Sequence, residues 1–322
     1  MKKNEQIEQF FRHHAARKSS QERVESIRTR NGRLPIVAAL NKAFDGAVAP
    51  EPETLKTLLA THSTDTLAYL TTTTIEHMSE DSFYFLPMAG HSTYFAHRII
   101  IKSTADYDLS LDFIDPALLK KYKAQSKANL QQRGITFFGR ETLSYFIHAG
   151  DMTISKWTHP KAITDLQGMR CQLQEQQTLT DGDVVHCQNN QTFMFDNASS
   201  SAVIMTLEIK RAMLPVSLIF SAADHTLRFQ NPSNEADSRI QLCMAILTKL
   251  DYVKAIPTLK TFLDHPQHFI RWYAMQQILA LDALEALSEL ADMATRDPHQ
   301  EVRQAAKETL LMIQQQGYEH AC

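Results

Sequence analysis

Glycine is scarce in this sequence, and the short motifs that depend on it are absent. The chain has nine glycines in 322 residues. It contains no GxGxxG pattern, no GxxxxGK[ST] phosphate-binding loop and no GxSxG nucleophile elbow. Such loops need glycine where the backbone approaches a phosphate closely or turns sharply. The sequence therefore gives no support for nucleotide binding or for nucleophilic catalysis by serine.

Cysteines are few, and no long apolar run is present. The four cysteines are widely spaced and form no CxxC pair. A disulfide framework is therefore not expected in a chain of this size, and a reducing compartment fits. The residues after Met-Lys-Lys are polar where a secretory signal would be apolar, and no segment reaches the roughly 20 apolar residues that span a bilayer. We expect a cytoplasmic protein with no membrane span.

Strong net charge is also lacking, although the charge is unevenly distributed. The formal net charge is -3, but residues 1–33 carry nine Lys or Arg against four Glu. A basic arm of this kind can attract nucleic acid or an acidic partner. It has no interleaved aromatic residues, so we interpret it as a solvated helical face. No nucleic acid partner is expected.

The hydrophobic pattern predicts three segments. Apolar residues recur at helical spacing over 1–80, which predicts a helical N-terminal segment. Short runs of aromatic and β-branched residues separated by turns fill 81–232, interrupted by one helix that begins at Pro116. This region predicts a closed antiparallel barrel or a sandwich. The helical period returns over 233–322, so the fold class is α+β with several domains.

The C-terminal segment contains an internal repeat. Copies begin at Asp251 and Asp282, and after a one-residue shift the prolines and arginines of the two copies correspond: Pro266 to Pro298 and Arg271 to Arg303. A repeat of 31 to 32 residues built from two helices is typical of an α-solenoid. Ile270 and Val302 precede the matched arginines and are expected to face inward. The stretch DPHQEVRQAAKETL resembles the second helix of HEAT repeats, which implies a surface for binding other proteins.

Residues 182–197, GDVVHCQNNQTFMFDN, hold the second sequence signal. They resemble the closing motif of the cupin family, in which a glycine and an asparagine keep the positions of Gly182 and Asn197. The resemblance implies a cupin-like barrel, also called a double-stranded β-helix, for residues 81–232. Phe193 stands where that motif has its metal-binding histidine, and no His-x-His lies upstream. We therefore expect no metal and no cofactor.

Several residues are candidates for sites. Those for a ligand pocket in the barrel are Arg140, His148, Trp157, His159, His186 and Phe193. Those for partner binding on the HEAT-like surface are Arg296, His299, Arg303 and Lys307. Arg140 beside Glu141 would serve as a substrate clamp, or as an exposed ion pair at the start of a strand. The one His-x-Glu triplet, at 299–301, is interpreted as helix-start polarity.

The whole chain resembles bacterial proteins of uncharacterised activity that join a cupin-like barrel to C-terminal HEAT repeats. The resemblance implies a non-catalytic binding or scaffold protein with a small-molecule or peptide pocket in the barrel and a protein partner on the repeats. The alternative is a divergent cupin-type metal-dependent enzyme of the oxygenase or isomerase class. It would use His148, His159, His186 and Glu175, and it requires these side chains to converge inside the barrel.

Overall fold

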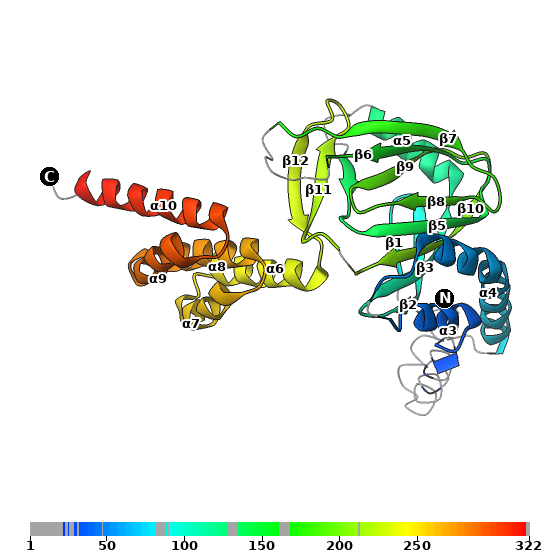
Figure 1. Ribbon diagram of the computed structural model, residues 1–322, viewed down its shortest axis with the longest axis horizontal. Helices are drawn as coiled ribbons and strands as arrows, with labels where there is room; N and C mark the ends of the chain where they lie inside the picture. Colours follow the sequence, from blue (N-terminus) through cyan, green and yellow to red (C-terminus); the bar gives the residue numbers. More distant parts are fainter. Residues whose placement is uncertain are drawn as a thin grey trace, which may run out of the picture. The chain divides into compact units, whose positions relative to one another are not determined.

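The computed structural model divides the chain into two compact units, residues 1–230 and 231–322 (Figure 1). Most of the basic N-terminal arm lies outside the described residues. The structure describes 22, 25, 29–30, 32–46, 48–80, 88, 90–127, 134–160, 168–211 and 213–319.

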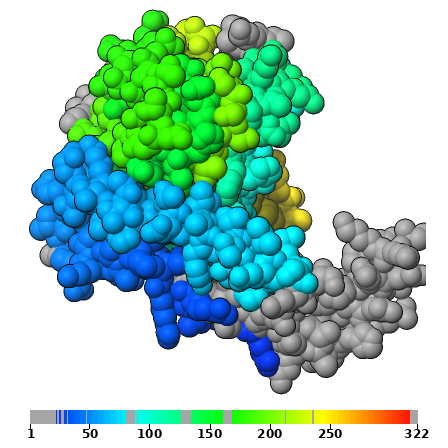
Figure 2. All heavy atoms as spheres, turned by 90° about the vertical axis from the view of Figure 1, so that its right-hand side faces the viewer, coloured from blue at the N-terminus to red at the C-terminus, as the bar shows by residue number. Residues whose placement is uncertain are grey.

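Two helices near the N-terminus belong to unit 1. Helix α3 (Pro35–Ala43) begins with a proline, whose fixed φ suits the first helical turn. Helix α4 (Pro52–Glu80) packs against it through apolar residues of both helices. Their shared core continues into one face of the largest sheet. Figure 2 shows these helical residues in blue beside the strands in green.

The strands of unit 1 form three antiparallel sheets. The largest has the order β1-β2-β3-β10-β5-β8, and the others have the orders β12-β11-β4 and β7-β6-β9. The strands are β1 (Gly90–Ser92), β2 (Ala96–Ser103), β3 (Tyr107–Ile114), β4 (Gly134–Phe137), β5 (Glu141–His148), β6 (Thr153–Thr158), β7 (Gln172–Thr178), β8 (Val184–Cys187), β9 (Gln191–Asn197), β10 (Ala202–Ile209), β11 (Val216–Ser221) and β12 (Leu227–Pro232). The predicted helix is α5 (Pro116–Lys127), and Asp115 caps it by accepting from the backbone N–H groups of Ala117 and Leu118.

The expectation of a closed barrel is wrong for the described strands. The short strand β8 pairs with β5, whereas β9, which follows it after a brief turn, pairs with β6 in another sheet. The sheets instead pack through apolar side chains in two further core clusters, one around Phe146 and one around Phe137. Face-to-face packing of this kind holds a sandwich together without hydrogen bonds across every edge.

Apart from Asn231 and Pro232, which end β12, the regular elements of unit 2 are helices. It comprises α6 (Glu235–Lys249), a first-repeat helix broken into η2 (Val253–Ala255), α7 (Ile256–Lys260) and η3 (Thr261–Asp264), then α8 (His268–Leu281), α9 (Ala283–Arg296) and α10 (Gln300–Glu319). Ile270 and Val302 are buried in its core, as predicted. Asp282 caps α9 by accepting from Leu284 and Glu285. No described helix is long and apolar enough to cross a membrane.

Candidate functional site

The six-stranded sheet carries a polar inner face. On β3, Tyr107, Leu109 and Leu111 join the core shared with the helices. Side chains of a strand alternate between faces, so Ser110 and Asp112 lie on the opposite side. Both of these residues are buried. A row of buried polar groups therefore runs along the face that the helices do not cover.

Two arginines and two carboxylates form a network on this face. Arg98 Nε donates to Asp112 Oδ1 at 2.6 Å and Arg98 Nη2 to Asp112 Oδ2 at 3.0 Å, a bidentate pair. Arg98 also donates to Glu208, which accepts from Arg140 Nη1 at 2.6 Å. Thr206 Oγ1 donates to Asp112 Oδ2 at 2.7 Å. The two positive charges offset the two negative ones within the network.

Burial and pairing act in opposite directions on Arg98. Burial alone would lower its pKa, but the hydrogen bonds and charges of Asp112 and Glu208 outweigh that effect and raise the pKa above its ordinary value. Arg98 therefore stays charged at any physiological pH. Because both carboxylates are already paired with it or with Arg140, the network is a structural element of the sheet more than a vacant ligand site.

Cys187 lies on the same inner face. It is buried beside Thr142, whose side chain it contacts by a hydrogen bond, and near the charges of Lys156 and Glu175. Burial raises the pKa of the thiol to about 11, so it is protonated at neutral pH. A thiol in this state is a poor nucleophile and a poor metal ligand.

The candidate pocket histidines do not converge. His148 is half exposed, and its Nδ1 lies 3.1 Å from Asp181 Oδ2. His186 Nε2 lies 2.6 Å from Glu141 Oε1, and its register partner Leu143 faces the helix-side core, so His186 is on the face opposite Cys187. The structure thus does not bring these two residues together with His159 or Glu175 into one site.

His159 is buried in the cluster around Phe137. Its ring lies against Phe137 and Phe220, and its Nδ1 is 2.7 Å from the carbonyl oxygen of Pro160. Burial lowers the pKa of His159 and outweighs that hydrogen bond, so the ring is neutral at pH 7. Trp157 packs against the same cluster and meets the ring of His225 edge to face, with the ring centroids 4.8 Å apart. Both rings contribute to the core.

Phe193, Arg140 and Glu141 also have the surroundings of structural residues. Phe193 packs against the Phe146 cluster and meets Phe195 edge to face at 5.3 Å. Arg140 and Glu141 do not pair as a clamp, because Arg140 reaches Glu208 while Glu141 reaches His186. Adjacent strand residues point to opposite faces, which explains why the two separate.

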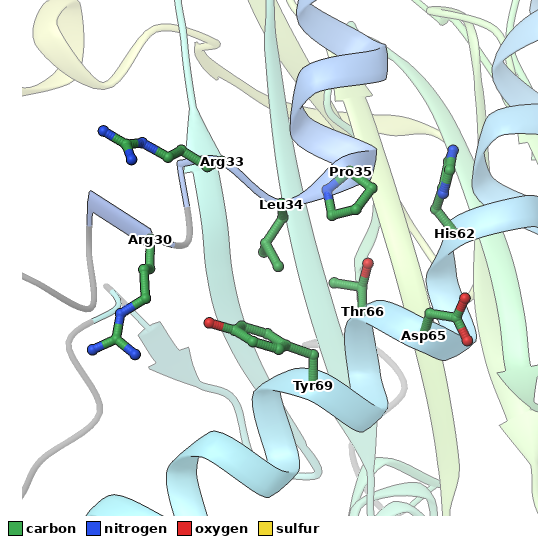
Figure 3. Close-up of a pocket in the computed structure, with 8 residues that line it drawn as sticks. All are labelled: Arg30, Arg33, Leu34, Pro35, His62, Asp65, Thr66 and Tyr69. Carbon is green, nitrogen blue, oxygen red and sulfur yellow. The ribbon is translucent and has the colours of Figure 1, made fainter.

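Two cavities stand out on the described surface, and neither is lined by strand residues. The first, about 340 Å³, lies between α3 and α4 and is lined in part by Arg33, His62 and Tyr69 (Figure 3). The second, about 620 Å³, is a groove in unit 2 at the turns joining its helices. The residues that line this unit 2 groove are Lys260, Leu263, Asp264, His265, Pro266, Arg271, Glu289, Asp292, Met293, Arg296, Asp297 and Pro298.

A buried ion pair lines the unit 2 groove. Arg271 donates to both carboxylate oxygens of Asp297, at 2.8 and 2.7 Å, and to the carbonyl oxygens of His265 and Pro266. Burial raises the pKa of Asp297, but the hydrogen bonds and charge of Arg271, with the N–H of His299, hold it below its ordinary value. The pair joins the turn before α8 to the turn before α10.

The partner-binding candidates have different surroundings. Arg296 is exposed, lines the unit 2 groove and pairs with Asp292. Arg303 is half-buried and donates to the carbonyl oxygen of Asp297 at 2.6 Å, so it supports the turn. Lys307 is exposed, whereas His299 is half-buried and stacks on His268.

Sequence comparison bears on unit 2. Residues 229–311 match the model of the HEAT repeat family, whose repeats bind other proteins in general. No curated protein matches the chain. The matched range covers the region in which the internal repeat was predicted.

Solved structures that resemble the chain include three cupin-like or cyclase proteins with low identity. The chain is similar to KdgF from Halomonas sp., with a TM-score of 0.25 and 11% identity over 38% of this chain and 86% of that one. It is similar to an RmlC-like cupin from Shewanella frigidimarina, with a TM-score of 0.23 and 8% identity over 40% and 91%. It is also similar to the polyketide cyclase RemF from Streptomyces resistomycificus, with a TM-score of 0.22 and 7% identity over 38% and 74%.

The charged network on the inner face was not predicted from the sequence. A signal was present, because YDLSLDFI (107–114) alternates polar with apolar residues and AVIMTLEI (202–209) does so over its second half. Such alternation ordinarily indicates one face in water. Here both faces are largely covered, and the polar positions pair with each other across strands. Only the pairing of distant strands shows which charges meet.

Proposed function

We propose that the protein is a non-catalytic binding or scaffold protein, in which the HEAT-like repeats bind a segment of another protein. The observation that supports this most directly is the unit 2 groove of about 620 Å³, which opens at the turns of a region that matches HEAT repeats. Stacked helix pairs present such turns at regular intervals along one surface, a geometry that suits an extended chain.

The chemistry of the unit 2 groove suggests the kind of segment it would bind. Leu263, Met293 and the two prolines supply apolar contact, and charged side chains of both signs surround them. Lys260 is held by Glu289 at 2.7 Å and Glu285 at 3.4 Å, whereas Arg296 is exposed at the rim. Apolar anchors within a charged rim are the usual composition of a protein-binding surface.

For unit 1 we propose a scaffold role. The polar groups of its inner face are mutually paired, and its clusters around Phe137 and Phe146 are closely packed. The two cavities described above are not lined by strand residues, so neither of them supports the small-molecule or peptide pocket expected in the barrel. The enzyme alternative requires His148, His159 and His186 to converge with Glu175, and no observation favours it.

Site-specific crosslinking tests the role of the unit 2 groove. A photoreactive residue replaces Arg296, which lines the groove, and as a matched control replaces Leu284, which is exposed at the other end of the same helix α9. We expect one discrete crosslinked protein from position 296 and not from position 284, and less of it when Asp264→Lys changes the charge of the wall. Identical products from both positions, or none, would show that the groove is not the binding surface.

A further inference from the structure

Two imidazole rings meet where the second helices of the two repeats begin. His268 is the first residue of α8, and His299 directly precedes α10. Their ring centroids are 3.7 Å apart, and their planes differ by 6°. Both side chains are half-buried. The repeat brings them together although 31 positions separate them in the chain.

The buried ion pair fixes the backbone that carries His268 and His299. The backbone N–H of His299 donates to Asp297 Oδ1 at 2.7 Å. Asp297 in turn accepts from Nε and Nη2 of Arg271, which lies one turn along α8 from His268. The two histidines are therefore attached to turns that are tied to each other. Fixed surroundings of this kind reduce the cost of arranging side chains around an ion.

A carboxylate completes a set of three possible ligands. Glu301 lies in the first turn of α10, and one ligand atom from each of His268, His299 and Glu301 falls within 4.8 Å of the others. Among the described residues this is the one group of three with that geometry. His299 Nδ1 is buried and has no hydrogen-bond partner in the described structure, so a lone pair or a proton there has nothing to satisfy it.

Two imidazole nitrogens and one carboxylate oxygen suit a particular class of ion. Borderline divalent ions of the first transition row, Zn²⁺ above all, prefer such mixed nitrogen and oxygen ligands, whereas Mg²⁺ and Ca²⁺ prefer oxygen alone. Neutral imidazole is the ligating form.

We propose that His268, His299 and Glu301 bind one zinc-like divalent ion, with water at the remaining positions, and so link the turns before α8 and α10. The lone pair of an imidazole lies in the plane of its ring, so the two stacked rings direct theirs in parallel. Binding then requires one ring to turn about its Cβ–Cγ bond. The half exposure of both side chains leaves room for that rotation. The site is separate from the crosslinking position at Arg296 and does not depend on the proposed partner.

Zinc titration of the full chain tests the site. The exposed Cys243 and the terminal Cys322 are first replaced by serine, because a free thiol binds zinc by itself. Calorimetry is expected to show one equivalent of Zn²⁺ bound, and Mg²⁺ at the same concentration is expected not to compete. His268→Ala and His299→Ala should each abolish that equivalent. Glu301→Gln, an exposed change, should weaken it by about tenfold or more.

Two variants provide matched controls. His148→Ala removes a half-exposed histidine of unit 1, and Gln300→Ala changes the exposed residue between two of the proposed ligands. Both should bind zinc as the parent does. The proposal is overturned if the parent binds no zinc, or if a bound equivalent survives in His268→Ala and His299→Ala. If either alanine variant loses the helical circular dichroism signal of the parent, the test rests on the exposed change Glu301→Gln. Unchanged zinc affinity in Glu301→Gln then overturns the proposal.

Discussion

Replacing Asp297 by alanine should be among the most damaging single changes in unit 2. The Arg271 and Asp297 side chains are 7% and 3% exposed, so the pair lies almost entirely out of water. In Asp297→Ala, the guanidinium of Arg271 keeps only the carbonyl oxygens of His265 and Pro266 as acceptors, at 2.9 and 3.1 Å. Removing one partner of a buried ion pair leaves an uncompensated charge, which costs about 3–5 kcal/mol.

That cost is large for a unit of this size. Unit 2 spans residues 231–322, and in domains of comparable length each kcal/mol shifts the melting temperature by about 4–8 °C. The expected fall is therefore roughly 12–40 °C for this unit. Amide hydrogen exchange followed by mass spectrometry resolves the peptides of unit 2 from those of unit 1. Protection should collapse in α8 and α10 while the strands of unit 1 keep theirs.

Asp292→Ala is the matched control for this experiment. It removes the carboxylate that pairs with Arg296, where the two side chains are 62% and 74% exposed. An exposed pair of this kind contributes under about 1 kcal/mol. Equal loss of protection in Asp297→Ala and Asp292→Ala would refute the reasoning, because burial would then not distinguish the two pairs.

Two further predictions concern the repeat core and the response to acid. Val302→Asp buries an unpaired carboxylate in the unit 2 core and should lower the free energy of unfolding by several kcal/mol. The exposed change Gln300→Asp on the same helix should lower it by under ~1 kcal/mol. Thermal melts in which the two variants behave alike would contradict the helical register. Burial lowers the pKa of His159, so the unfolded state binds more protons below the ordinary histidine pKa of about 6.5. The stability from keeping His159 neutral is full above that pH and falls as the pH drops toward the folded-state pKa. Urea unfolding of unit 1 should give a lower free energy of unfolding at pH 5.5 than at pH 7.5, both in the parent and in the control His148→Gln. Equal free energies of unfolding at the two pH values would count against the prediction.

The sequence predicted the types of element better than the way they assemble. The repeat that begins at Asp251 and Asp282 is local, so the pattern showed both its helices and the inward positions of Ile270 and Val302. Pairing between distant strands is not local, and nothing in residues 182–197 shows that β8 and β9 join different sheets. The prediction of a closed barrel was therefore wrong, because it depended on how the edge strands β8 and β9 pair.

The site residues show the same limit. The spacing of His148, His159 and His186 could not reveal that they lie on different faces and in different clusters. Conversely, His299 and Glu301 were interpreted as helix-start polarity, because the sequence does not place His268 beside them. The one-residue shift between the two copies hides that contact, since His268 corresponds to Gln300 and not to His299. The contact between the two rings is therefore visible only in the three-dimensional structure.

The Arg98–Asp112–Glu208–Arg140 network has a consequence for how the chain finds its strand pairing. Three members come from β2, β3 and β10, and Arg140 directly precedes β5; β10 lies between β3 and β5. A slip of β10 by one residue would turn Glu208 and Thr206 toward the helix-side core and separate the Glu208 carboxylate from Arg98 and Arg140. The misaligned sheet would then bury the Glu208 charge among apolar side chains, a cost that the native register avoids. The network thus favours the native register of β10 over shifted registers that apolar side chains alone would tolerate.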